Sequence, residues 1–266
     1  MEMSMRAVGK VTVSLLVAIL VIVTSFSYQA TAKSKEPSST SITNPDKTIQ
    51  LTKLNDNVWA HTSYNVWNGT TYDHNGLIVS TSKGAVLIDT AWGNDQKTEE
   101  LLQMIEKHVK QKVVLAIVTH AHDDSISGIR ALLNQGIDVR STRLTAELAV
   151  KYGYPSPNPT LDEAPVLKIG GTVIETFYPG EGHSQDNITV WLPKYKLLFG
   201  GCFVKSLEAK DLGNLLDANV EQWDDSINKV LKKYPFIKTV VAGHGNWGDK
   251  SLLFHTLDLI RQHTQK

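Results

Sequence analysis

Cysteine is almost absent from this chain of 266 residues, in which Cys202 is the single example. An intramolecular disulfide is therefore excluded, and so is a fold stapled by disulfides. A lone thiol serves either as a small buried apolar side chain or, as a thiolate, as a metal ligand. Cys202 taken by itself fits both interpretations equally well.

An excess of charge of one sign is also missing. Lysine plus arginine number 27, aspartate plus glutamate number 27, and the formal net charge at pH 7 is zero. Proteins that bind nucleic acid usually carry a basic face, so we expect no nucleic-acid partner. With 41% hydrophobic and 20% charged residues, the composition is that of an ordinary globular protein.

A membrane-spanning run is missing as well, because the apolar segment 11–24 is shorter than the ~20 residues that a transmembrane helix needs. Arg6 and Lys10 precede this segment, and Ala30-Thr31-Ala32 follows it. This order is typical of a secretory signal peptide with an A-x-A cleavage site. We expect residues 1–32 to be removed, and the mature protein to be periplasmic or extracellular with no membrane anchor.

The most informative stretch is Thr119-His120-Ala121-His122-Asp123-Asp124-Ser125. It follows residues 113–118, an apolar and mostly β-branched run that predicts a buried strand. Imidazoles and a carboxylate at the end of a rigid strand are typical zinc ligands. The alternative is a polar loop that caps the next helix, with both histidines solvated.

The remaining pattern predicts one domain. Residues 33–48 are rich in Ser, Lys, Pro and Thr and indicate a flexible lead-in. Across residues 49–266, two halves each contain strands, then a strand that feeds a loop, then a helix. This order predicts an α/β fold, a four-layer αββα sandwich.

Asn68-Gly69 lies between β-prone residues and predicts a hairpin over 64–72. Its aromatic residues, including Trp67, either pack down on the protein or form a flap over an apolar substrate.

Three more candidate ligands each follow a predicted strand, in loops that contain glycine: His183, Cys202 and His244. Glycine allows sharp turns and close approach of the backbone, and active sites of sheet proteins collect at strand ends. Four histidines, one aspartate and one cysteine could form two adjacent metal sites. The other histidines are expected to have surface or core roles: His61, His74, His108, His255 and His263.

Together these residues resemble the class B metallo-β-lactamases, in the subclass with one three-His zinc site and one Asp-Cys-His site. The resemblance runs from about Gln50 to the C-terminus. The His-x-His-x-Asp core alone marks only a wider superfamily of metallo-hydrolases, whereas Cys202 followed by Lys205 is far more specific. Further matching stretches are 182–187, 201–206, 211–214 and 243–245.

The resemblance implies two Zn²⁺ ions per chain. The first would be bound by His120, His122 and His183, and the second by Asp124, Cys202 and His244. Lys205 would bind the carboxylate of the drug, and Asn214 would polarise the lactam carbonyl. Asp124 and Asn214 would thus be catalytic, and Trp67 would contact substrate from the flap.

The implied activity is hydrolysis of the β-lactam amide bond in penicillins, cephalosporins and carbapenems, which confers antibiotic resistance. Zinc lowers the pKa of bound water to about 7, so hydroxide is the nucleophile and no acyl-enzyme is needed. The expected partner is the small-molecule substrate, and the expected state is a monomer.

Two positions depart from the family pattern: Ser125 stands where many members have Arg, and Ser127 replaces the first residue of a Gly-Gly pair. Neither change removes a ligand, but both could alter affinity for the second zinc and substrate range. The alternatives are a thioesterase or lactonase of the same superfamily, which typically has His at the position of Ser125, and a zinc-binding module without catalysis. Three donors per site leave a position open for water, which favours an enzyme.

Overall fold

The computed structural model describes residues 40–162 and 164–265. The expected signal peptide and residues 33–39 of the expected lead-in lie outside the described residues.

The first sheet has seven strands that follow one another in chain order. The pairs β2–β3, β3–β4 and β4–β5 are antiparallel, and the pairs β5–β6 and β6–β7 are parallel. The bounds are β1 (Ser41–Thr43), β2 (Ile49–Lys53), β3 (Val58–Trp67), β4 (Thr70–Thr81), β5 (Gly84–Ile88), β6 (Val113–Ile117) and β7 (Asp138–Arg140).

The second sheet has five strands in the order β12-β11-β10-β9-β8. Its pairs are antiparallel except β11 with β12, which is parallel. The bounds are β8 (Val166–Ile169), β9 (Thr172–Phe177), β10 (Thr189–Leu192), β11 (Leu197–Gly201) and β12 (Thr239–Ala242).

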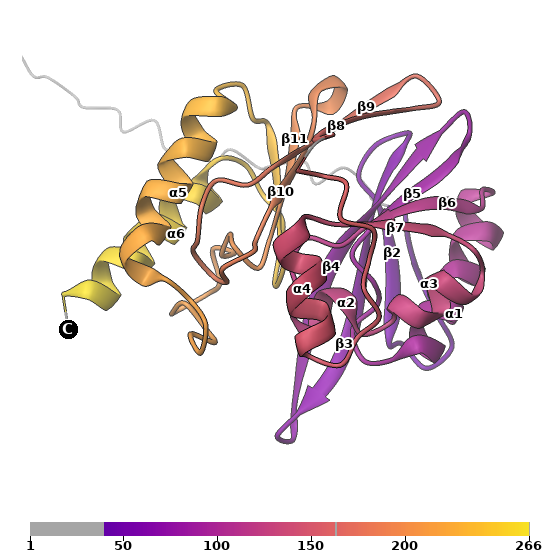
Figure 1. Cartoon of the computed structure of the whole chain (residues 1–266), viewed down its shortest axis with the longest axis horizontal. Helices are drawn as coiled ribbons and strands as arrows, with labels where there is room; N and C mark the ends of the chain where they lie inside the picture. The colour runs from indigo at the N-terminus through magenta and orange to yellow at the C-terminus, as the bar shows by residue number, and fades with distance from the viewer. Residues whose placement is uncertain (1–39, 163, 266) are drawn as a thin grey trace, which may run out of the picture. The chain divides into compact units, whose positions relative to one another are not determined.

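Helices cover the outer face of each sheet, which confirms the expected αββα layering (Figure 1). α1, α3 and α4 pack on the first sheet, and α5 and α6 pack on the second. The bounds are α1 (Asp95–Met104), continued by a π-helical turn over 105–109, α2 (Asp123–Ile126), α3 (Ile129–Asn134), α4 (Arg143–Lys151), α5 (Val220–Lys233) and α6 (Ser251–Thr264).

The sequence of the central strand β5 is apolar throughout because both faces of the strand are buried. In β5, Ala85 and Leu87 face the core beneath the helices, while Val86 and Ile88 face the core between the two sheets. Successive side chains of a strand point to opposite faces, so a strand buried on both faces has no polar alternation. β5 and β6 therefore form a rigid base for the loop that follows β6.

The predicted hairpin is confirmed at Asn68-Gly69. Both residues have positive φ, 50° and 77°, as a two-residue I′ turn requires. Helix α1 is capped by Asn94, whose Oδ1 accepts a hydrogen bond from the Lys97 N–H at 2.9 Å.

Two expectations about local structure were wrong. The expected lead-in contains β1, which pairs with β2 and packs Ile42 against the core, so pairing overrides the polar composition there. The expected loop after His122 contains the short helix α2. His74 lies in β4, where its ring is fully buried.

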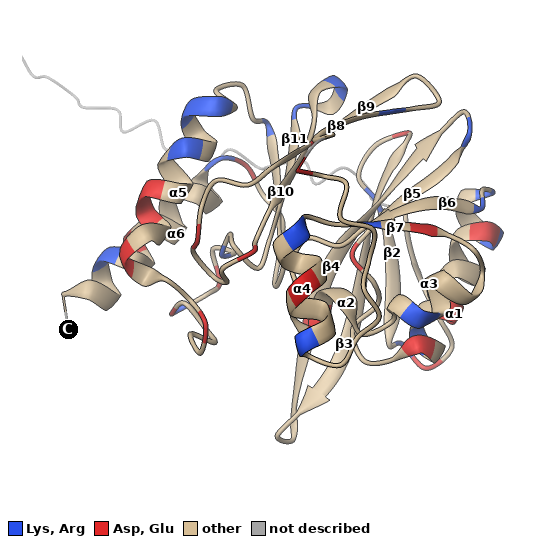
Figure 2. Ribbon diagram, in the orientation of Figure 1, with Lys and Arg blue, Asp and Glu red and all other residues tan. Residues whose placement is uncertain are grey.

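Acidic and basic residues share the same helices, as Figure 2 shows for α4 and α5. Glu221 lies in the first turn of α5 and Lys232 and Lys233 in its last, where each charge complements the helix dipole. Within residues 40–162 and 164–265, we find no helix with the length and apolarity needed to span a membrane.

Candidate metal centre

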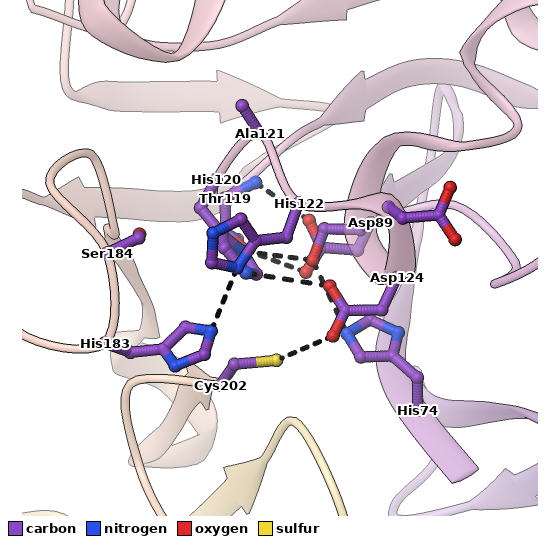
Figure 3. A network of polar contacts seen from close by, with 12 residues as sticks. His74, Asp89, Thr119, His120, Ala121, His122, Asp124, His183, Ser184 and Cys202 are labelled. Atoms are coloured by element: carbon purple, nitrogen blue, oxygen red, sulfur yellow. Dashed lines mark hydrogen bonds and ion pairs between the residues drawn. The ribbon is translucent and has the colours of Figure 1, made fainter. Parts of the chain in front are cut away.

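The predicted ligands converge at one end of the two sheets. The loop from β6 into α2 carries His120 and His122, the first turn of α2 carries Asp124, and the β9–β10 loop carries His183. Cys202 directly follows β11, and His244 follows β12 by two residues. Figure 3 shows the side chains of His122 and His183, and those of Asp124 and Cys202, pointing toward one another. The structure therefore brings all six predicted ligands together.

The first cluster consists of His120, His122 and His183, whose ligand atoms all lie within 4.8 Å of one another. Nδ1 of His122 lies 3.1 Å from Nε2 of His183. Nε2 of His120 is buried without a hydrogen-bond partner among the described residues. A buried polar nitrogen without a partner is costly, and a bound cation would satisfy it.

The outward nitrogens of two of these rings have polar partners. Asp217 accepts a hydrogen bond from Nε2 of His122 at 2.9 Å, which leaves Nδ1 to face the cluster. Nδ1 of His120 lies 3.1 Å from Oγ of Ser125, which leaves Nε2 for the cluster. Metal-bound histidines typically have such partners on the opposite nitrogen. Asp217 carried no motif of its own, and sequence analysis missed it.

The second cluster is built around Asp124. Sγ of Cys202 and Nε2 of His244 each lie 3.3 Å from Oδ2 of Asp124, and they are 3.3 Å from each other. With bonds of 2.0–2.3 Å, tetrahedral zinc would separate its ligand atoms by about 3.3–3.8 Å. Nδ1 of His244 donates to the Asp73 carbonyl, so Nε2 presents its lone pair to the cluster. The donor set therefore fits zinc.

The two clusters adjoin each other. Nε2 of His120 lies 3.6 Å from Oδ1 of Asp124, and neither atom has a hydrogen-bond partner among the described residues.

A seventh donor, His74, also belongs to the second cluster. One of its ring nitrogens lies within 4.8 Å of both Asp124 and Cys202 (Figure 3). The expectation that His74 has only a surface or core role is therefore too narrow. An isolated histidine in a strand carries no spacing signal, so its position beside Asp124 could be found only in the fold.

Buried polar groups hold the β6–α2 loop. Asp89 accepts hydrogen bonds from the N–H and the hydroxyl of Thr119, both at 2.8 Å. Asp186 accepts from the Ala121 N–H at 2.9 Å. Burial raises the pKa of Asp89 to about 8, and its φ of 61° is rare for a residue other than glycine. These supports lie on either side of His120 and were not anticipated.

Asn75 joins the two sheets at the site. Its amide donates to the carbonyl of Ala242 at 3.1 Å and to that of Gly245 at 2.8 Å. Its Oδ1 accepts from the Thr62 hydroxyl at 2.7 Å. These hydrogen bonds hold β4 next to the loop that carries His244.

The close approach of backbones expected at the glycines is clearest at Gly243. A Cβ atom there would lie 2.5 Å from the Cys202 nitrogen and 2.6 Å from its sulfur. Any side chain at this position would displace Cys202 from the cluster.

Burial sets the charge of most donors. It lowers the pKa of His120 and of His74 to about 3, so both rings are neutral near pH 7 and keep a lone pair for a metal. Burial alone would raise the pKa of Asp124, but the adjacent His74 and His244 rings hold it well below its usual value. Burial raises the pKa of the Cys202 thiol, so a cation is required to stabilise its thiolate.

A cleft of about 870 Å³ opens above the two clusters. Its lining includes the three residues expected to contact substrate: Trp67, Lys205 and Asn214. Trp67 is 55% exposed at the hairpin, whereas Lys205 is buried and its Nζ lies 5.4 Å from the centre of the Trp223 ring. Oδ1 of Asn214 accepts from the Leu216 N–H at 3.1 Å, so its amide donors remain the groups able to bind a carbonyl.

Comparisons with known proteins agree with this geometry. A family model described as the Metallo-beta-lactamase superfamily matches residues 69–244. A curated relative from Bacillus sp. (strain 170), named Metallo-beta-lactamase type 2, is 53% identical over 83% of this chain and 85% of the relative. A protein of the same name from Elizabethkingia meningoseptica is 40% identical over 82% of this chain and 87% of the relative.

Solved structures place the fold in the same family. A metallo-β-lactamase from Pontibacter korlensis superposes with a TM-score of 0.77 at 46% identity, covering 80% of this chain and 99% of that one. FIM-1 from Pseudomonas aeruginosa, solved in a mono-zinc form, superposes with a TM-score of 0.75 at 29% identity, covering 82% and 97%. The resemblance first seen in the histidine motif and Cys202 is thus confirmed, and this chain belongs to the metallo-β-lactamase superfamily.

Proposed function

We propose that this protein hydrolyses the amide bond of β-lactam antibiotics and thereby confers resistance. The observation that carries the proposal is the pair of adjoining donor clusters at the base of a cleft that also contains a buried lysine. Curated relatives at 53% and 40% identity bear the name of this activity.

Two Zn²⁺ ions are the proposed cofactors. His120, His122 and His183 would hold one ion, and Asp124, Cys202 and His244 the other. Bound zinc would supply water activation near neutral pH and Lewis-acid stabilisation of developing negative charge. Residues of the chain position the ligands of both ions. Asp217 and Ser125 orient the rings of His122 and His120, and Asp124 lies between the two sites, with its Oδ1 3.6 Å from Nε2 of His120.

Lys205 is proposed to bind the carboxylate that β-lactams carry beside the ring nitrogen. Its ammonium group lies over the Trp223 ring, an arrangement that stabilises the cation and holds it in the wall of the cleft. Burial lowers the pKa of Lys205, so an anionic partner would restore part of the solvation that the ammonium has lost.

Asn214 and Trp67 are proposed to act on the reacting ring from the rim of the cleft. The amide N–H groups of Asn214 would donate to the lactam carbonyl oxygen, where negative charge develops. Trp67 would cover the apolar part of the substrate from the exposed hairpin, beside Val66. A substrate side chain packed there would also exclude water.

A substrate panel tests the proposed activity against the alternatives in the superfamily. Purified protein would be assayed on a penicillin, a chromogenic cephalosporin, a carbapenem, a thioester and a lactone, each with and without a chelator. We expect chelator-sensitive hydrolysis of the β-lactams. Turnover of the thioester or lactone alone would overturn the proposal, and turnover of none would favour a non-catalytic zinc module.

We further propose that the protein is exported after removal of residues 1–32 and acts as a monomer. The basic segment, apolar segment and A-x-A site support export, and a site built from donors of one chain supports the monomer. N-terminal sequencing of secreted protein should begin near Lys33, and light scattering should report one chain. A retained Met1 or a dimer would overturn the respective proposal.

A further inference from the structure

His74 has no role in the sites proposed so far, yet its surroundings are those of a ligand. Its side chain is fully buried, and one ring nitrogen lies within 4.8 Å of the ligand atoms of both Asp124 and Cys202. The ring also packs edge-on against His244, with centroids 5.5 Å apart. His74 therefore lies beside every proposed ligand of the second ion.

The polar contacts in this cluster leave a buried oxygen unpaired. Nε2 of His74 lies 3.4 Å from Oγ of Ser125, and Oδ1 of Asp124 is buried without a hydrogen-bond partner among the described residues. Figure 3 shows one ring nitrogen of His74 facing the carboxylate of Asp124. A cation between them would remove the desolvation cost of that buried oxygen.

The separations are compatible with one shared ion, because one ring nitrogen of His74 lies within 4.8 Å of both Asp124 and Cys202. Two ligands with bonds of 2.0–2.3 Å to one zinc lie at most about 4.6 Å apart. A hydrogen bond requires about 3.2 Å or less between nitrogen and oxygen.

We propose that His74 is a fourth protein donor to the second metal ion, together with Asp124, Cys202 and His244. The inference rests on the proposed second zinc site and extends it. Four protein donors make that site closer to a closed, structural one, which retains metal more firmly than a three-donor site. The protein would then keep its second ion when free zinc is scarce, and the Ser125 hydroxyl would connect His74 with His120 of the first site.

Metal binding, rather than activity, tests this proposal. Metal-free wild type and the variants His74→Gln and His74→Ala would be titrated with Zn²⁺ against a chromophoric chelator. We expect both variants to bind the second ion at least about tenfold more weakly, with the first site little changed. His61→Gln is the matched control, because His61 is equally buried in the neighbouring strand but lies outside the donor clusters.

A direct measurement keeps the proposal testable even if a variant folds poorly. In wild type loaded with ¹¹³Cd²⁺ and labelled with ¹⁵N-histidine, His74 should show a nitrogen–cadmium coupling. The proposal is overturned if this coupling is missing while that of His244 is present, or if His74→Gln binds both ions as wild type does. A wild type that binds fewer than two ions would instead overturn the second zinc site itself, and the His74 proposal with it.

Discussion

The sulfur of Cys202 lies 3.3 Å from Oδ2 of Asp124, although 78 positions separate the two residues in sequence. Cys202 follows β11 of the second sheet, and Asp124 lies in the first turn of α2 beside the first sheet. A buried thiol and a buried carboxylate at this distance repel each other once both are ionised. A protonated Cys202 thiol can donate to this carboxylate, whereas a thiolate there requires a cation between the two groups. Cys202 is therefore the most informative position to change.

We predict that Cys202→Ser weakens the second metal site and leaves the three-His site largely filled. A hydroxyl is a harder and poorer ligand for zinc than a thiolate. Activity should fall well below that of wild type and depend more on added zinc. Cobalt-substituted wild type should show a thiolate-to-metal charge-transfer band that the variant lacks. If Cys202 is only a small buried residue, the variant should lose ~1–3 kcal/mol of stability and keep both ions.

We predict that Lys205→Ala raises KM for β-lactams more than it lowers kcat. A lysine that only anchors a carboxylate contributes similar binding to the ground state and the transition state. Steady-state kinetics on a cephalosporin measure both constants, with the exposed Lys210→Ala as control. A collapse of kcat at unchanged KM would show that Lys205 takes part in the chemistry.

The sequence pattern identified Cys202 as a candidate ligand but did not identify Asp217 as a supporting residue in the site. Cys202, His183 and His244 follow predicted strands in glycine-containing loops, so the alternation of strand and loop identified them as candidates. Asp217, Asn75 and His74 carry no such pattern. Their roles arise from partners 95, 167 and 51 positions away, and only the folded chain brings those partners together.

The fold shows the same division. The αββα layers could be predicted because both halves of the chain show the same order of strands followed by a helix. β1 could not, because its short polar sequence is stabilised by pairing with β2 rather than by its own propensity.

We predict that Asp217→Asn weakens zinc binding at the three-His site by roughly 10–100-fold. The amide keeps an acceptor for Nε2 of His122 but loses the negative charge that makes the imidazole a stronger ligand. Zinc affinity would be measured by chelator competition, with the exposed Asp225→Asn on α5 as control. Equal affinity in wild type and Asp217→Asn would show that the 2.9 Å contact does not support the metal.

We predict that His61 makes the metal-free protein less stable in mild acid. Burial lowers its pKa from 6.5 to about 4 in the folded state. The unfolded chain therefore binds the proton more readily between these values, and the free energy of unfolding falls as pH drops from about 6.5 toward 4. The contribution of this one residue is about 2 kcal/mol between about pH 7.5 and about pH 5.

Urea unfolding of chelated protein at these two pH values measures the effect. His61→Gln can still donate to the Ile88 carbonyl but cannot take up a proton, so its stability should depend less steeply on pH than that of wild type. The exposed His263→Gln should behave as wild type does. Parallel pH dependence in wild type and His61→Gln would contradict the assignment.

The central claim is that hydrolysis of β-lactams depends on metal held by these two clusters. The most direct measurement is a titration of metal-free protein with Zn²⁺, in which bound zinc and cephalosporin hydrolysis are followed in the same samples. We predict no turnover before zinc is added, turnover that rises with bound zinc, and saturation at two ions per chain. Hydrolysis by the metal-free protein, or two bound ions with the β-lactam left intact, would contradict the account.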